Sequence, residues 1–435
     1  MPAVSAVSRR NTTVFTSTLV LLMLLIKKRK QVREQRQPRR WWIRPVFLAR
    51  KQEGLYHTAM KRMREGDHGF FFKFYRMTPA LFDVLLRFVA LDLTKIHVSR
   101  ETLEPGERLA ITLSYLASGQ DIPSVALAYR VGIETARLCI HETCEAIWER
   151  LKDHVMKTPT KADWHCIAKG FHSRWQFPNC LGAVDGKHVA IVCPPKSGSK
   201  FFNYKGTFSI VLMAVVDSDC KYVLVDVGAE GRQSDGGIFK ESSFGCDLSK
   251  GRLDIPAVGT LPGTSTCVPY AFVGDEAFQL RKDFMRPYPA KCLNDTMRIF
   301  NYRLSRARRC AENAFGITAA RWRILLRTIN VQPSHVDFVV KAACVLHNFL
   351  TLYNPHAHQF LDREDSFGNV VGGRWRHGVQ HVPDNSFFAM APTQARNYDG
   401  DAGAARRLFA SYFSSTAGQV PWQWNLPGLT KKQPS

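Results

Sequence analysis

The chain has 435 residues, enough for two or three domains with sizeable cores. Its 60 Lys and Arg residues exceed its 37 Asp and Glu residues, giving a formal net charge of +23. This excess favours a polyanionic partner, most commonly nucleic acid. The 11 Cys residues are an odd number without a CxxC pair. They argue against a disulfide framework and a zinc ribbon, and favour a reducing compartment.

The first candidate element is the apolar stretch Val14–Ile26, whose 13 residues fall short of the ~20 that span a bilayer as a helix. A strongly basic run follows it where a signal peptide would have small residues at its cleavage site. We therefore expect no stable membrane insertion. A signal or anchor, which would make the protein a membrane-anchored enzyme, remains an alternative.

The basic run Lys27–Arg44 contains nine Lys or Arg residues and a single acid, Glu34. Such a run is typical of a nuclear-import signal or of an arm that binds DNA phosphates. The residues that we expect to contact DNA are Lys27, Lys28, Arg29 and Lys30. A merely solvated tail is the alternative. We predict that residues 1–68 form a basic arm that is largely disordered or helical.

A helical pattern begins at residue 69, with Thr78 as an N-cap and Pro79 at the first helical position. The stretch Asp121–Trp148 has the outline of a helix-turn-helix, whose second helix can enter a major groove. Arg130 and Arg137 are its candidate phosphate contacts. Ordinary helical bundles share this pattern, so DNA binding by residues 69–157 is one of two interpretations.

Strand patterns follow the helical region. The β-branched, apolar run Cys180–Val192 predicts a buried strand interrupted by Asp185. Two further runs, Thr207–Val216 and Lys221–Val227, predict a hairpin, and Tyr270–Val273 predicts a fourth strand. Helices are expected at Ile238–Leu248, Asn301–Ile324, Val336–Leu352 and Ala404–Phe413. The rest of 354–435 is rich in Gly, Asn and Asp, which predicts a mostly disordered tail.

Three acids lie on these predicted strands and helices, and their order along the chain indicates a fold. Asp185 lies on the first strand, Asp275 ends the fourth and Glu312 lies on the long helix. Three antiparallel strands, a crossover and a fourth strand beside the first are the ribonuclease H-like topology, which would bring the three acids together. Oxygen ligands alone favour Mg²⁺ or Mn²⁺ over zinc.

Each acid also has a simpler interpretation. Asp185 precedes a glycine and could begin a hairpin turn. Asp275 could be a turn residue at a strand end, and Asp235 in the glycine-rich stretch could cap the next helix. Glu312 could form a surface ion pair with Arg308 or Arg309.

Several long motifs, in order, resemble one family. They are FHSRWQFPNCLGAVDGKHVAI, FFNYKGTFSIVLMAVVD, GRQSDGGIF, YAFVGDEAFQLRKDFMRPYP, FNYRLSRARRCAENAFGITAARWRIL and CVLHNFL. Together they resemble the Harbinger transposase-derived nucleases of the PIF/Harbinger transposase superfamily, from about Tyr75 to Leu350. The chain departs from that pattern at Cys310-Ala311 and Thr318, where bulkier aliphatic residues are expected.

The resemblance implies a ribonuclease H-like DDE nuclease domain over residues 158–353, a mixed sheet flanked by helices, preceded by the all-α region. It also implies catalytic acids at Asp185, Asp275 and Glu312, with Asp235 as a further ligand of Mg²⁺ or Mn²⁺. We expect a nuclear, metal-dependent DNA endonuclease that cleaves phosphodiester bonds by a two-metal DDE mechanism. It could remain cytoplasmic without its partner. A Myb-like DNA-binding protein is the partner that the resemblance implies. The oligomeric state is open, including a homo-oligomer, and a non-catalytic DNA-binding protein that keeps the fold is the alternative function.

Overall fold

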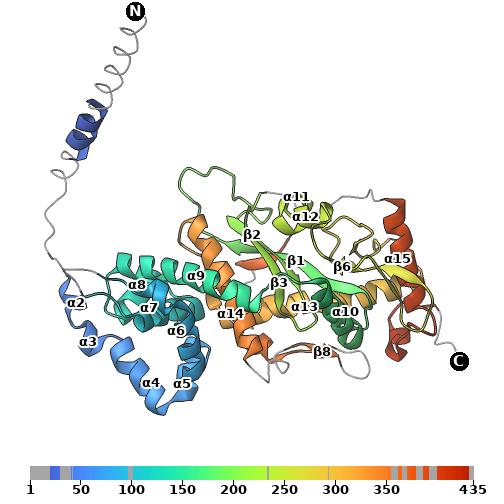
Figure 1. Cartoon of the computed structure of the whole chain (residues 1–435), viewed down its shortest axis with the longest axis horizontal. Coiled ribbons are helices and arrows are strands. Elements are labelled where there is room, and N and C mark those ends of the chain that lie inside the picture. The colour runs from blue at the N-terminus through green and yellow to red at the C-terminus, as the bar shows by residue number, and fades with distance from the viewer. Residues whose placement is uncertain are drawn as a thin grey trace, which may run out of the picture. The chain divides into compact units, whose positions relative to one another are not determined.

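The computed structural model describes residues 20–29, 41, 43–96, 101–232, 235–291, 293–353, 361–364, 370–378, 386–390 and 399–430. The chain forms two compact units, Met1–Ala49 and Arg50–Ser435. In the first, residues 20–29 and α2 (Pro45–Leu48) are helical (Figure 1). The apolar side chains of Val20–Ile26 are exposed.

The second unit begins with a helical region. Its elements are α3 (Arg50–Glu53), the π-helical η1 (Tyr56–Met60), α4 (Lys61–Gly66), α5 (His68–Tyr75), α6 (Pro79–Leu93), α7 (Pro105–Ser118), α8 (Ile122–Ala128) and α9 (Ile133–Val155). The Thr78 side chain accepts a hydrogen bond from Leu81 N, with Pro79 next in the chain. The predicted start of α6 is therefore confirmed, since this cap satisfies one of the free N–H groups of the first turn.

A mixed sheet follows. Its strands are β1 (Cys180–Ala190), β2 (Ser209–Val216), β3 (Tyr222–Glu230), β6 (Ala271–Val273), β7 (Phe284–Met285) and β10 (Phe387–Ala389). The order is β3-β2-β1-β6-β7, and β10 also pairs with β1. As predicted, β1, β2 and β3 are antiparallel and the fourth strand, β6, lies beside β1; β6 pairs with β1 in parallel. Two small hairpins, β4 (Val258–Thr260) with β5 (Cys267–Pro269) and β8 (Arg363–Glu364) with β9 (Val370–Val371), lie outside this sheet.

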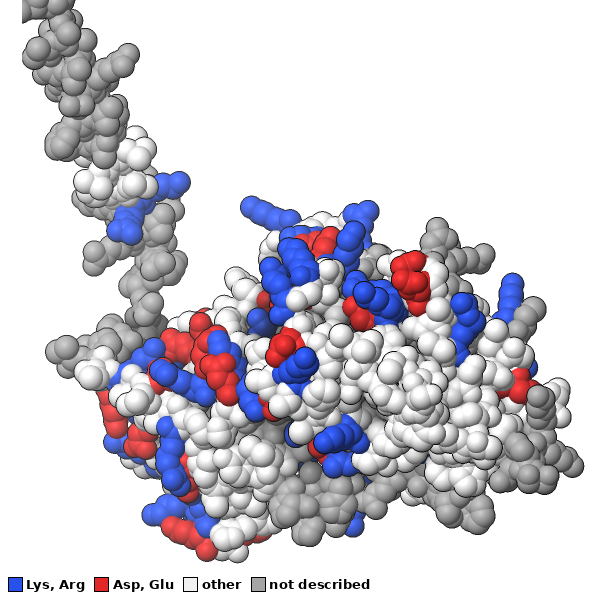
Figure 2. Space-filling model, turned by 45° about the vertical axis from the view of Figure 1, so that its right-hand side comes forward, with Lys and Arg blue, Asp and Glu red and all other residues white. Residues whose placement is uncertain are grey.

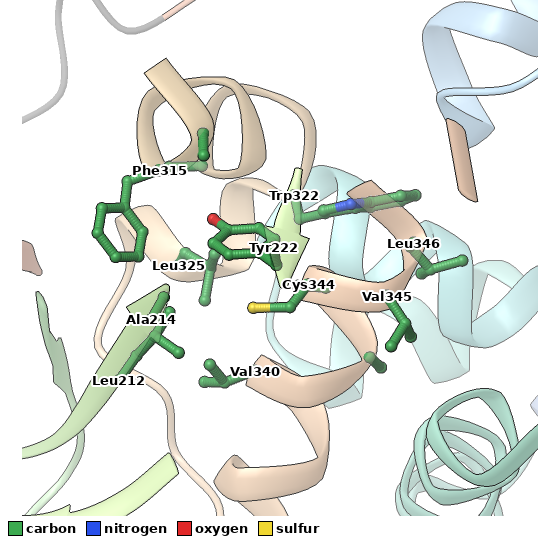
Figure 3. Close-up of a cluster of buried hydrophobic side chains, with 14 of the residues drawn as sticks. Leu212, Ala214, Tyr222, Phe315, Trp322, Leu325, Val340, Cys344, Val345 and Leu346 are labelled. Atoms are coloured by element: carbon green, nitrogen blue, oxygen red, sulfur yellow. The ribbon is translucent and has the colours of Figure 1, made fainter. Parts of the chain in front are cut away.

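Helices pack against both faces of the sheet (Figure 1). One face is covered by α13 (Asp295–Arg321) and α14 (Pro333–Leu352), the other by α11 (Asp235–Glu241), α12 (Ser243–Ser249) and the start of α10 (Lys161–Trp175). Figure 3 shows the first interface, where Leu212 and Ala214 of β2 meet Val340 and Cys344 of α14. The predicted class, a ribonuclease H-like mixed sheet flanked by helices, is confirmed.

Thr318, where the family pattern favours a bulkier aliphatic residue, places its hydroxyl 3.0 Å from that of Tyr222, so a buried polar pair replaces apolar packing.

Of the described helices, α14 alone is long and apolar enough to cross a membrane, and 67% of its most apolar window is buried inside the protein.

The C-terminal region differs from the predicted, mostly disordered tail. Its described residues add β10 to the main sheet and form η4 (Arg374–Gly378), the expected helix α15 (Gly400–Phe413) and η5 (Pro421–Asn425). Phe409 and Phe413 of α15 pack on Phe177 with ring centroids 5.5 and 5.0 Å apart. Short groups of apolar residues supply these contacts. The polar composition of the surrounding sequence obscures them in a prediction of disorder. Residues 354–360, 365–369, 379–385, 391–398 and 431–435 lie outside the described residues.

The predicted boundary between residues 157 and 158 does not separate two compact units, because Asn348 of α14 joins both sides. Its Oδ1 accepts from Tyr222 N at 2.9 Å. Its Nδ2 donates to Tyr222 O at 2.7 Å and to Val155 O at 2.9 Å. Asn348 is 1% exposed, so these bonds satisfy backbone groups that water does not reach.

We predict that Asn348→Leu lowers the free energy of unfolding by about 3 kcal/mol, because buried groups of Tyr222 and Val155 lose their partners. Urea unfolding followed by circular dichroism measures the change. Thr351→Val is the matched control on α14, since the Thr351 hydroxyl donates only to His347 O within the helix. Equal stability of the two variants would contradict the proposed link.

Candidate active site

The register between β1 and β6 places two acids side by side. Ala183 of β1 lies beside Val273 of β6 in a parallel pair. Two residues further along each chain stand Asp185 and Asp275. Because side chains alternate across a strand, both acids are expected on the face that Ala183 and Val273 turn towards α13.

Asp185 is part of a continuous strand and does not begin a turn. It pairs with Ala214 of β2 and is 5% exposed. On the other edge of β1, pairing with β6 ends at Ala183 and pairing with β10 begins at Lys187. Asp185 therefore lies where this edge of β1 passes from one neighbour to the next.

Gly186 allows the C-terminal region to approach this position closely. A Cβ at residue 186 would lie 1.6 Å from the Met390 sulfur, so any side chain at this position would force the Met390 side chain to move. The Asp-Gly pair thus serves close packing within the sheet, and the alternative of a hairpin turn is wrong.

Each of the two acids has a cationic neighbour. Lys187 Nζ lies 3.7 Å from Asp185 Oδ2, and Arg308 Nη2 of α13 lies 3.8 Å from Asp275 Oδ2. Asp275 Oδ1 accepts a hydrogen bond from Ala277 N at 2.9 Å, as in a turn at a strand end. The turn interpretation of Asp275 is therefore correct.

The electrostatics of Asp275 reflect these neighbours. Burial raises the pKa of its carboxyl, the charge of Arg308 opposes the rise, and the charge of Asp185 adds to it. The two carboxylates therefore repel each other, and a bound cation would relieve this repulsion.

Glu312 lies on the same face of α13 as two residues that contact Asp275 or Lys187. Arg308, four residues earlier, contacts Asp275, and the ring of Phe315, three residues later, lies 5.8 Å from Lys187 Nζ. Residues at these spacings share one helix face. Glu312 itself is exposed, and its charge helps to raise the pKa of Arg376 in η4, after the larger effect of the Asp362 hydrogen bond.

The fit of this site to a divalent metal rests on the Asp185–Asp275 pair. Hard cations prefer carboxylate oxygens, and two mutually repelling carboxylates suit such an ion. Among the described residues, however, no group of three or more Asp, Glu, His or Cys side chains is close enough to hold a metal. Glu312 shares the face without completing the group. Asp235 begins α11, but its side chain lies outside the described residues.

The predicted DNA contacts are distributed differently. Lys27, Lys28 and Arg29 end the exposed helix 20–29, and Lys30 lies outside the described residues. Arg130 Nη2 lies 2.8 Å from Glu53 Oε2, and Arg137 Nε lies 3.3 Å from Glu134 Oε1. The helix-turn-helix outline is present as α8 and α9, but its two arginines already have acidic partners.

Lys187, Arg308 and Arg376 are site neighbours that the sequence analysis missed. Lys187 could have been found, because it stands two residues after Asp185 and so shares its strand face. Arg308 was considered only as a partner of Glu312, whereas it lies against Asp275. Arg376 comes from the region that was expected to be mostly disordered.

Comparison with known proteins agrees with this arrangement. Residues 184–348 match the family described as DDE superfamily endonuclease. The chain is 26% identical over 293 residues to the protein Antagonist of Like Heterochromatin Protein 1 of Arabidopsis thaliana, covering 65% of this chain and 74% of that protein. It is 21% identical over 304 residues to HARBI1 of Rattus norvegicus, named as a candidate nuclease, covering 68% and 82% of the two chains. No solved structure is significantly similar. The matched segment contains Asp185, Asp275 and Glu312 on the predicted strands and helix, and this chain therefore carries a DDE superfamily endonuclease domain.

Proposed function

We propose that this protein is a metal-dependent endonuclease that cuts DNA phosphodiester bonds. The observation that carries the proposal is that Asp185 on β1 lies near Asp275, which follows the neighbouring strand β6 of a DDE domain. Asp185, Asp275 and Glu312 would hold Mg²⁺ or Mn²⁺, with Asp235 as a further ligand. Bound there, the metal would activate an attacking oxygen and stabilise the leaving oxygen of the phosphodiester.

The chain's own residues prepare this site in two ways. The main sheet and α13 hold Asp185 buried and Asp275 partly buried, so little rearrangement is needed when substrate arrives. Lys187 and Arg308 bring positive charge to the same place, which favours the approach of a phosphate.

Residues 192–208, the loop after β1, support DNA as the substrate. The loop exposes Lys196, Lys200 and Lys205, and Arg232 after β3 bonds to its Ser199. It also exposes the rings of Phe202 and Tyr204, on which unpaired bases could stack. Lys and Arg side chains predominate at the top of the compact unit in Figure 2.

Asn203 gives the loop a defined shape. It is 3% exposed, and its amide nitrogen donates to Thr207 Oγ1 at 2.9 Å and to Ser209 Oγ at 2.8 Å. Lys205 Nζ lies 4.2 Å from the centroid of the Phe388 ring in β10. The lysines are therefore presented from an anchored loop, which reduces the entropy lost when DNA binds.

Localisation and partners follow as further parts of the proposal. The basic run Lys27–Arg44 would direct the protein to the nucleus and add non-specific affinity for DNA. A Myb-like partner would supply sequence recognition, and its absence would leave protein in the cytoplasm. A transposase origin agrees with the motifs described above.

We predict that the protein nicks or cuts plasmid DNA with Mg²⁺ or Mn²⁺, and that Asp185→Asn reduces the rate by at least about a hundredfold, because one ligand of the metal site is lost. Gel electrophoresis of a supercoiled plasmid measures the rate. Asp283→Asn is the matched control, since this carboxylate pairs with Arg281 and with neither Lys187 nor Arg308 among the described ion pairs. DNA binding by the wild type without cleavage would instead support the non-catalytic alternative.

We predict that replacing Lys196 and Lys205 together by Ala lowers the slope of log affinity for DNA against log salt by about 2, because each phosphate contact releases counterions. Fluorescence anisotropy over a salt series measures the slope. Replacing Lys161 and Lys169 of α10, both exposed, removes the same charge elsewhere and serves as the control. Equal slopes for the two double variants would place the DNA on another surface.

A further inference from the structure

Lys187 and Arg308 stand in the same relation to the two site carboxylates. Each places a nitrogen just beyond hydrogen-bonding distance, at 3.7 and 3.8 Å, from one carboxylate oxygen. Each side chain is 19% exposed, so both reach the surface while staying largely buried. Two positive charges thus face two negative charges in the metal-free site.

These contacts are looser than other ion pairs of the chain. Arg281 binds Asp283 with two hydrogen bonds of 2.8 and 3.0 Å, a geometry that fixes the guanidinium. Arg308, in contrast, lies too far from Asp275 for a hydrogen bond, at 3.8 Å. Its buried Nε has no hydrogen-bond partner among the described residues. Its guanidinium therefore keeps donors for another acceptor.

The Lys187 ammonium also lies near an aromatic ring. Its Nζ lies 5.8 Å from the centroid of the buried Phe315 ring, close enough for a cation–π attraction. An ammonium on a flexible stem can turn towards a new anion without moving the strand that carries it. The carboxylate of Asp185 and an incoming anion would therefore compete for the same ammonium.

We propose that Lys187 and Arg308 are exchangeable counterions, which balance Asp185 and Asp275 in the metal-free protein and bind the phosphate of the DNA backbone once a divalent metal occupies the two carboxylates. This inference rests on the proposed function and adds two substrate-binding residues to it. Without metal, the four side chains carry no net charge. With one divalent ion they carry two positive charges, so metal binding turns a neutral site into a phosphate-binding site.

The exchange couples the two ligands. A metal that takes the carboxylates frees both cations for the phosphate, and a phosphate that takes the cations frees both carboxylates for the metal. Because coupling between two binding sites is reciprocal, Mn²⁺ should strengthen DNA binding by the same factor as DNA strengthens Mn²⁺ binding.

The test uses Lys187→Gln and Arg308→Gln in the full chain. We expect either variant to bind Mn²⁺ more tightly by calorimetry, because a cation that competes for the carboxylate is gone. We expect the same variants to bind a short DNA duplex about tenfold more weakly when Mn²⁺ is present, because a charged hydrogen bond to phosphate is lost. The strengthening of DNA binding by Mn²⁺ should shrink accordingly. Anisotropy measured in the cold, over times too short for cleavage, gives these affinities.

The proposed role predicts tighter binding of Mn²⁺ together with weaker binding of DNA. A purely structural role would instead weaken the binding of both ligands. Arg308→Lys keeps the charge and should restore the wild-type pattern, whereas Arg281→Gln is the control and should change neither affinity. Weaker Mn²⁺ binding in both Gln variants, or unchanged DNA binding with Mn²⁺, overturns the inference while wild-type cleavage stands. If the wild type binds no Mn²⁺, the proposed function and this inference fail together. If one variant does not fold, the other decides.

Discussion

The parallel pairing of β1 with β6 is the constraint on which the rest of this structure depends. It brings Asp275, which follows β6, close enough to Asp185 on β1 for the charge of Asp185 to help raise the pKa of Asp275. Burial increases the cost of keeping these acids charged, because a carboxylate loses hydration when water is excluded. The fold offsets it with Lys187 and Arg308 and not by moving the acids apart. Carboxylates whose pKa is shifted by burial and by a like charge are typical of functional sites.

Helix α13 links this pair to the C-terminal region. Arg308 contacts Asp275 and Phe315 lies by Lys187, while Asn313 Oδ1 accepts from Asp362 N at 3.0 Å and from Trp375 Nε1 at 3.1 Å. Near the start of the same helix, Arg303 donates to Gly418 O at 3.0 Å. A change in the packing of the C-terminal region would therefore shift the helix that carries Glu312.

The sequence was sufficient for the parts of the fold that depend on local pattern. Apolar, β-branched runs predicted β1 to β3, and a recognisable N-cap predicted the start of α6. The order of the acids along the chain predicted the pairing of Asp185 with Asp275, because the topology follows from the order of elements. Long-range contacts were not predictable in this way. Nothing local indicates that Asn348 bridges Tyr222 and Val155, that Met390 packs on a glycine 204 positions earlier in the sequence, or that Arg308 pairs with a strand end and not within its own helix.

The distribution of charge also bears on how DNA would be recognised. The exposed positions of α9 include Glu134, Glu145 and Glu149, and a phosphate backbone is repelled by such a face. The same helix packs against α14, where the rings of His141 and His335 are tilted by 53° with centroids 3.7 Å apart. These contacts favour the second interpretation of the helix-turn-helix outline, a helical bundle that supports the sheet. This arrangement agrees with the proposal that DNA binds at the loop 192–208, and that another protein selects the DNA sequence.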